Sequence, residues 1–447
     1  MRVTTVLLAG LLIASLSGHA VEENKPAHVT IVKEQDVYQL RVNGKPFIVK
    51  GAGISKAAGN NIAALAEAGG NSFRTWSQTG AEQYLAAAKA SGLMVVMGFD
   101  LKQELHGFDY NDKAAVAAQF ARAKAMVDQY KNHPNLLAWA VANEPNLVFA
   151  QDGSRKLANP KVYDAIGEII DYIHKVDPHH PVTYTFAGIS AEEIGIALTH
   201  TPQVDFISVQ VYADLENIPQ LIRAANVDKP FMITEFGALG HWERPSTSWG
   251  REIEESSGTK AASLALRIQK GIANNPTGKD IGHFAFMWGQ KQERTPTWYG
   301  MFNKDGTTDA RIDELTKFWT GSYPANRAPL TTDITLNQQR AEQSVYVAPG
   351  SRVQVQVTAT DPDNDKLRYD WVLLEEVATR SEGGAFEAEP DAVPLHASNK
   401  NTPDYRAGKL MFTAPATEGE YRIFAYVYDD KGKVGNANFP FYVKATR

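Results

Sequence analysis

Short apolar runs alternate with amphipathic stretches over most of this chain, from Val29 to Tyr323. The runs are rich in β-branched and aromatic residues, which favours strands. In the stretches between them apolar residues recur every three or four positions, as in helices with one buried face. The strand candidates are Phe47–Lys50, Ser72–Trp76, Met94–Gly98, Leu137–Ala142, Val182–Phe186, Phe206–Tyr212, Phe231–Thr234 and His283–Trp288. Eight strands that alternate with helices predict an α/β protein with a (β/α)₈ (TIM) barrel, assigned to residues 28–323.

The main alternative is an open, doubly wound sheet. That fold is disfavoured because no glycine-rich phosphate loop follows the first strand. The opening stretch "VYQLRVNGKPFIVKG" carries Asn43-Gly44, a type I′ turn signal, and predicts a hairpin that closes the bottom of the barrel. The helical stretches include Ile62–Ala68, Ala81–Ala90, Ala114–Tyr130, Tyr163–Lys175, Ile218–Ala225 and Lys260–Ala273.

The pattern changes after Tyr323. Pro324 and Pro329 lie among polar residues and indicate a linker over residues 324–330. Beyond it, runs such as "SRVQVQVTAT" and "EYRIFAYVYDD" alternate with period two and have no helix between them, which predicts a small all-β sandwich over residues 331–447. The segment "ATDPDNDKLRYDW" resembles the strand-turn-strand corner of PKD-type and other immunoglobulin-like modules.

The first twenty residues have the composition of a secretory signal peptide. A basic start is followed by the apolar run Val3–Leu16 and by the small residues Gly18 and Ala20, so we expect cleavage after Ala20 and a secreted or periplasmic protein. The chain has no cysteine, which suits a bacterial periplasm or exterior. Loss of Arg2 with this segment changes the net charge from −6 to −7, which argues against a nucleic-acid partner. No later segment is apolar enough to suggest membrane insertion.

Two predicted barrel strands end in carboxylates. "WAVANEPN" places Asn143 and Glu144 after the fourth strand, and "KPFMITEFG" places Glu235 at the end of the seventh. In a closed barrel these strand ends face one mouth. A lone Asn-Glu-Pro is as well explained by a loop carboxylate, but a facing pair is what glycoside hydrolysis requires. One carboxyl protonates the leaving oxygen, and the other attacks the anomeric carbon or directs water.

The pair and its surroundings resemble clan A of the glycoside hydrolases, which are retaining enzymes on this barrel. The resemblance implies that Glu144 is the acid/base, that Glu235 is the nucleophile, and that Asn143 contacts the sugar 2-hydroxyl. Retention requires the two carboxyl groups to lie about 5–5.5 Å apart.

The same resemblance assigns three supporting side chains. Arg74 in "NSFRTW" supports the nucleophile, Tyr212 in "SVQVY" hydrogen-bonds it, and Trp288 at the end of "FAFMW" forms an aromatic floor under the sugar. Taken singly, these residues are equally explained as a structural ion pair, a core tyrosine and simple packing.

Other aromatic residues near strand ends are candidates for the wall of a sugar-binding cleft. Trp76 and Trp242 are predicted to bind substrate. The wider set of candidates adds Phe99, Tyr110, Trp249, Trp298 and Tyr299.

The two-domain layout most resembles bacterial endo-β-1,3-glucanases of glycoside hydrolase family 158, so β-1,3-glucan is the expected substrate. The alternatives are a β-mannanase, xylanase, β-1,4-glucanase or glucanosyltransferase of the same clan, or a non-catalytic polysaccharide-binding protein. A monomer is expected. Since neither carboxylate lies in the sandwich, the sandwich is expected to be dispensable for turnover on soluble oligosaccharides.

No cofactor and no metal site are expected. The segment "DPDND" begins like a calcium loop, but Lys366 and Val372 stand where an EF-hand needs Gly and Glu. A β-turn is therefore predicted there, with an incidental surface cation as the alternative.

Overall fold

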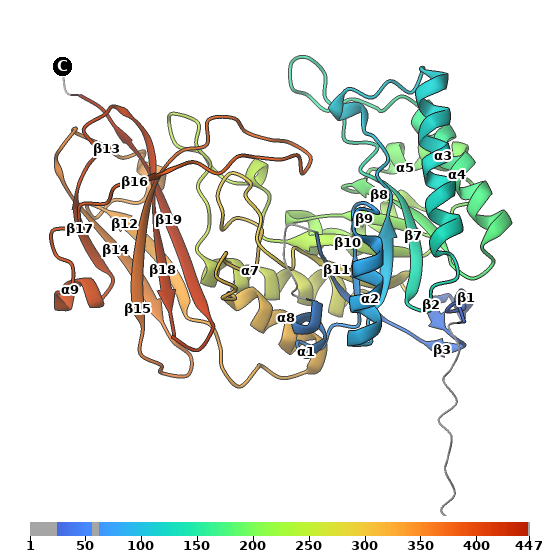
Figure 1. Ribbon diagram of the computed structural model, residues 1–447, viewed down its shortest axis with the longest axis horizontal. Helices are drawn as coiled ribbons and strands as arrows, with labels where there is room; N and C mark the ends of the chain where they lie inside the picture. The colour runs from blue at the N-terminus through green and yellow to red at the C-terminus, as the bar shows by residue number, and fades with distance from the viewer. Residues whose placement is uncertain (1–24, 56–61, 446–447) are drawn as a thin grey trace, which may run out of the picture.

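The computed structural model describes residues 25–55 and 62–445, so the expected signal peptide lies outside the described residues. Eight parallel strands form a closed barrel, which confirms the predicted TIM-barrel fold (Figure 1). In chain order they are β4 (Val49–Gly53), β5 (Ser72–Arg74), β6 (Met94–Gly98), β7 (Leu136–Asn143), β8 (Val182–Ala187), β9 (Ile207–Gln210), β10 (Phe231–Gly237) and β11 (Asp280–Phe286).

Amphipathic helices surround the barrel. The buried face of α4, for example, consists of isoleucines three and four positions apart, including Ile166, Ile170 and Ile173, which join the main hydrophobic core. Among the described residues, no helix has the length and apolar character needed to cross a bilayer. The helices are α1 (Ile62–Glu67), α2 (Ala81–Ser91), α3 (Lys113–Tyr130), α4 (Lys161–Val176), α5 (Ala191–His200), α6 (Ile218–Ala225), α7 (Ser257–Ile268), with a π-helical extension over Gln269–Ala273, and α8 (Ala310–Thr320).

The first barrel strand lies further along the chain than predicted. The sequence pattern placed it at Phe47–Lys50, whereas β4 covers Val49–Gly53. Its two glycines lower the strand propensity, but packing requires them. A Cβ on Gly51 would lie 2.4 Å from the ring of Phe284, and one on Gly53 would lie 2.3 Å from the ring of Trp76. Glycine here makes room for an aromatic side chain at the barrel mouth.

The predicted hairpin is present at the bottom of the barrel. Strands β1 (Val29–Glu34), β2 (Val37–Val42) and β3 (Lys45–Pro46) form an antiparallel sheet. Asn43 and Gly44 both have positive φ, 51° and 77°, as a type I′ turn requires. Leu40 shares a hydrophobic cluster with residues at the starts of barrel strands, including Val49, Met94 and Leu137.

Residues beyond α8 form a second, all-β domain beside the barrel (Figure 1). One hydrophobic core joins its two sheets, since Val355 and Phe412 of the first sheet cluster with Ile423 and Phe439 of the second. Its classification as immunoglobulin-like stays a prediction. The first sheet contains β12 (Leu330–Leu336), β14 (Arg352–Thr360) and β17 (Lys409–Thr413), and the second contains β13 (Tyr346–Val347), β19 (Val434–Val443), β18 (Gly419–Tyr428), β15 (Arg368–Glu375) and β16 (Ala392–Val393).

The "DPDND" segment forms a turn between β14 and β15. The Asp361 side chain accepts hydrogen bonds from the backbone N–H groups of Asp363 and Asp365. The three carboxylates lie close enough together to share a cation, but the turn hydrogen bonds already account for this local geometry.

A buried ionic cluster joins the two domains. Lys260 of α7 donates a hydrogen bond to Glu254 at 2.5 Å, and both side chains are almost fully buried. The hydroxyl of Thr297 also donates to Glu254, and so does the amide of Asn438 in β19. The Glu254 carboxylate therefore neutralises a buried lysine of the barrel while it binds the sandwich.

Replacing Glu254 should consequently destabilise the whole protein. In Glu254→Ala the Lys260 charge stays buried without its partner, which costs about 3–5 kcal/mol in the free energy of unfolding, measurable by chemical denaturation. The control is Glu216→Ala, which removes an exposed ion pair with Lys270 and should change stability little. Equal losses in the two variants would contradict this role of Glu254.

Candidate active site

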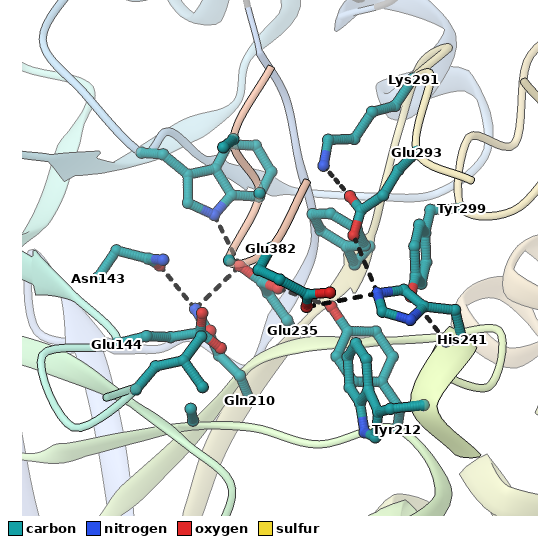
Figure 2. A pocket seen from close by; sticks show the side chains of 18 of the residues that line it. Asn143, Glu144, Gln210, Tyr212, Glu235, His241, Lys291, Glu293, Tyr299 and Glu382 are labelled. Atoms are coloured by element: carbon teal, nitrogen blue, oxygen red, sulfur yellow. Dashed lines mark hydrogen bonds and ion pairs between the residues drawn. The ribbon is translucent and has the colours of Figure 1, made fainter. Parts of the chain in front are cut away.

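Polar side chains from three barrel strands, Asn143 of β7, Gln210 of β9 and Glu235 of β10, meet at the mouth of the barrel. They line a cavity of about 1380 Å³ that contains both predicted carboxylates, Glu144 after β7 and Glu235 in β10. Figure 2 shows Glu144, Glu235 and Gln210 together at the centre of this cavity. The structure therefore brings together the two strand ends that the sequence singled out.

Glu235 is 6% exposed and is surrounded by donors. Its Oε1 accepts hydrogen bonds from the Trp76 indole N–H at 2.6 Å and from the Gln210 amide at 2.9 Å, and Arg74 approaches the same oxygen at 3.3 Å. Its Oε2 accepts the Tyr212 hydroxyl at 2.8 Å. The expected contacts of Arg74 and Tyr212 are thus present, and the four donors fix the carboxylate in one orientation.

Asn143 is held by the same network. Its Oδ1 accepts hydrogen bonds from Arg74 at 2.9 Å, from Gln210 at 2.8 Å and from Thr185 at 3.2 Å. Because the oxygen is committed to these donors, the Nδ2 end of the amide is the one that can donate to a ligand in the cavity.

Gln210 was not predicted as a site residue. Its signal in the sequence is a polar side chain inside the apolar strand "SVQVY", two positions before Tyr212 and on the same face. It joins Asn143 to Glu235 and therefore couples the ends of β7 and β10.

Glu144 has a different environment. It is half-buried, and its backbone adopts a φ of +47°, a left-handed conformation that is uncommon for residues other than glycine. Its backbone N–H donates to the carbonyl of Thr185 at 2.9 Å. Burial, and then the nearby charge of Glu235, raise the pKa of Glu144 to about 8, although Arg74 opposes this shift. Glu144 is therefore protonated at neutral pH and can act as an acid.

The aromatic candidates divide into two groups. Trp76, Phe99, Trp242 and Tyr299 line the cavity, and Trp242 is exposed. Tyr110, Trp249 and Trp298 are not among the lining residues, and Trp249 instead packs against Tyr346 and Tyr442 of the sandwich.

The predicted position of Trp288 at the floor of the sugar site is wrong. The ring of Trp288 is fully buried and packs against Phe302 and Trp319. Strand β11 ends at Phe286, and the Trp288 backbone N–H bonds to the carbonyl of Gly53. The indole therefore lies in the core, and Phe286 and Met287 occupy the cavity wall instead.

The sandwich also contributes to the cavity wall, while its dispensability for turnover stays a prediction. Arg380 and residues 382–387, which lie between β15 and β16, are on the wall. Figure 2 shows Glu382 of this loop near His241. Sequence patterns do not reveal this contribution, because the loop has no periodic signal and lies far along the chain from either carboxylate.

The cavity wall is acidic overall. It carries nine carboxylates, namely Asp100, Glu144, Asp214, Glu235, Glu243, Glu252, Glu293, Glu382 and Glu387, and five arginine or lysine side chains. Each of the five bases pairs with a carboxylate: Arg155 with Glu193, Arg244 with Glu255, Lys291 with Glu293, Arg294 with Glu252, Glu382 and Glu387, and Arg380 with Glu252.

Comparison with known proteins agrees with this chemistry. Residues 32–243 match the family described as glycosyl hydrolases family 2, TIM barrel domain. The probable mannan endo-1,4-beta-mannosidase C of Aspergillus terreus is 38% identical over 104 residues, which cover 22% of this chain and 25% of that protein. The beta-glucuronidase of Streptococcus agalactiae is 26% identical over 286 residues, which cover 55% of this chain and 45% of that protein. The chain thus spans less than half the length of each relative.

Solved structures show the same fold at low identity. The beta-glucuronidase 2 of Bacteroides uniformis aligns with 94% of this chain and 48% of its own, at a TM-score of 0.52 and 12% identity. The beta-glucuronidase of Faecalibacterium prausnitzii aligns with 66% of this chain and 52% of its own, at a TM-score of 0.51 and 19% identity. Residues 32–243 of the barrel are therefore similar to a TIM barrel domain of the glycosyl hydrolase family 2 type, and the two carboxyl groups at its mouth are the pair that glycoside hydrolysis requires.

Proposed function

We propose that the protein is a retaining β-glycosidase that works by double displacement, with Glu235 as nucleophile and Glu144 as acid/base. The observation that carries this proposal is the contrast between the two carboxyl groups. Glu235 is fixed by four donors, whereas Glu144 is protonated at neutral pH because burial and the charge of Glu235 raise its pKa. Pairs of carboxyl groups whose environments separate their roles in this way serve as acid and nucleophile.

The first step breaks the glycosidic bond. Glu144 gives its proton to the leaving oxygen while an oxygen of Glu235 bonds to the anomeric carbon and forms a glycosyl ester. Asn143 is placed to donate to the sugar 2-hydroxyl through Nδ2. The glycosyl ester on Glu235 carries no negative charge, so the pKa of Glu144 falls. Glu144 therefore stays ionised after it has given its proton to the leaving group.

The second step releases the sugar. Glu144, now ionised, takes a proton from a water molecule whose oxygen attacks the anomeric carbon. The bond to Glu235 breaks, and its carboxylate returns to the four donors. Both glutamates end in their starting protonation states.

We propose a neutral β-linked polysaccharide or oligosaccharide as the substrate. Several relatives are named beta-glucuronidases. Among the described residues, however, this wall carries nine Asp or Glu side chains and five Arg or Lys side chains that each pair with a carboxylate, which disfavours a uronate. The similarity to a mannan endo-1,4-beta-mannosidase is compatible with β-mannan. The comparisons give no support to β-1,3-glucan or to family 158, which the sequence had suggested. Experiments therefore need to show whether β-mannan or β-1,3-glucan is the substrate.

A substrate panel tests this proposal. We expect release of oligosaccharides from β-mannan or β-1,3-glucan, and little turnover of 4-nitrophenyl β-glucuronide, with products sized by chromatography. Rapid hydrolysis of the glucuronide would overturn the neutral-substrate proposal. Binding of a polysaccharide without cleavage would favour a non-catalytic binding protein.

The two glutamates should respond differently to substitution. Glu235→Ala should abolish turnover of every substrate, because no glycosyl ester can form, and azide should restore cleavage with inverted configuration. Glu144→Ala should lose turnover of natural glycosides but keep the first step on a 2,4-dinitrophenyl glycoside, whose leaving group needs no proton. Azide should then give a glycosyl azide of retained configuration, detectable by NMR. Identical responses of the two variants would contradict the assigned roles.

The raised pKa of Glu144 predicts the alkaline limit of activity. Since the first step requires the protonated form, kcat/KM on a natural oligosaccharide should fall as the pH rises through about 8. The same fall in kcat/KM at alkaline pH should be weak or missing with a 2,4-dinitrophenyl glycoside. An identical fall in kcat/KM at alkaline pH for both substrates would show that a group other than Glu144 controls the alkaline limit of activity.

A further inference from the structure

The loop that joins β15 and β16, residues 376–391, extends from the sandwich to the barrel mouth (Figure 1). Its base is attached to the segment that follows β11. Arg294 donates hydrogen bonds to the carbonyl of Ser381 at 2.7 Å and to the carboxylate of Glu382 at 2.6 Å. The backbone N–H of Arg294 donates to Glu387 at 2.6 Å. The loop is therefore anchored to the eighth strand of the barrel.

The anchor is buried and charged. The side chains of Arg294 and Glu387 are 4% and 0% exposed, and Glu252 provides a further carboxylate to Arg294 at 3.2 Å. Separating a buried charged pair of this kind leaves uncompensated charges, which is strongly unfavourable. The base of the loop is consequently fixed on the barrel.

The tip of the loop lies against the other side of the mouth. A Cβ on Gly383 would lie 2.5 Å from Leu105 and 3.4 Å from Leu147. Leu105 follows β6, and Leu147 follows β7 and donates its backbone N–H to the carbonyl of Glu144. Because β11 lies across the barrel from β6 and β7, the loop crosses the mouth and reaches the side that carries Glu144.

The same loop places an exposed aromatic residue on the cavity wall. Phe386 lines the cavity although its side chain is 91% exposed, the largest value among the exposed large hydrophobic residues that the structure describes. Trp242, on the β10 side, is another exposed aromatic on the same wall. Exposed aromatic faces in a polar cavity favour contact with the apolar C–H face of a ligand.

We propose that this loop forms the leaving-group side of the cleft and that Phe386 stacks on a sugar unit of the leaving group. The proposal rests on the proposed function. Glu144 protonates the leaving oxygen, so the sugar beyond the cleaved bond lies on the side of Glu144 and Leu147, where the tip of the loop lies. The sandwich thereby takes part in the choice of substrate, and a chain of sugars is preferred over a small leaving group.

The test compares Phe386→Ala with the unchanged protein on two kinds of substrate. The probes are mannohexaose and laminarihexaose, each labelled at the reducing end, and the 2,4-dinitrophenyl β-glycosides of mannose and glucose, whose leaving group is no sugar. The measured quantity is the ratio of kcat/KM on the cleaved hexaose to kcat/KM on the matching dinitrophenyl glycoside. We expect this ratio to fall by about tenfold in Phe386→Ala, mainly through KM, because the ring can no longer cover the sugar of the leaving group.

Phe386→Trp should restore the ratio, and the cleavage position within the labelled hexaose should shift only in Phe386→Ala. The matched control is Leu266→Ala, an exposed apolar residue of α7 outside the wall, which should leave the ratio unchanged. An unchanged ratio in Phe386→Ala, with the unchanged protein active on a hexaose, would overturn the role of Phe386 alone. Failure of the unchanged protein to cleave any of the four probes would overturn the proposed function together with this inference.

Discussion

Arg74 carries a positive charge into the mouth of the barrel, where its side chain is almost completely removed from water. A buried guanidinium is costly unless it is paired and hydrogen-bonded. Here it approaches the carboxylate of Glu235, donates to the carbonyl of Thr234 and donates to the amide oxygen of Asn143. One side chain thereby ties β5 to β10 and β7, so the ends of three strands cannot move independently.

The properties of Glu144 follow from this arrangement. Because Glu235 is fixed by its donors, its charge stays close to Glu144 and contributes to the raised pKa of that group. Gln210 adds a second bridge between Asn143 and Glu235. The charge of Glu235, the proposed nucleophile, thus acts on Glu144, the proposed acid, while Gln210 and Asn143 join Glu235 to the strand that precedes Glu144. Such pre-arranged dipoles are the main way in which active sites stabilise charge that develops during a reaction.

The barrel and the two carboxyl groups of the candidate site could be predicted from the sequence, because strand periodicity and carboxylates at strand ends are local signals. Arg74 and Glu235 lie within strands, where a residue's position determines its direction, whereas Glu144 and Tyr212 lie one and two residues beyond the ends of β7 and β9. Trp288 lies two residues beyond β11, as Tyr212 does beyond β9, but its ring packs in the core against Phe302 and Trp319, so strand position alone could not predict its burial. Residues 380–387 reach the cavity wall only because the two domains dock against each other. The hydrophobic pattern of a single segment does not show how domains dock.

The ionic anchor of the sandwich loop has a consequence for the order in which the protein is built. Arg294 precedes its partners Glu382 and Glu387 by 88 and 93 residues. During synthesis from the N-terminus, the barrel strands are complete while this arginine has Glu252 but still lacks its other two carboxylate partners, and the part of the cavity wall formed by the sandwich loop is missing. The finished cavity therefore depends on the docking of the sandwich as well as on the barrel.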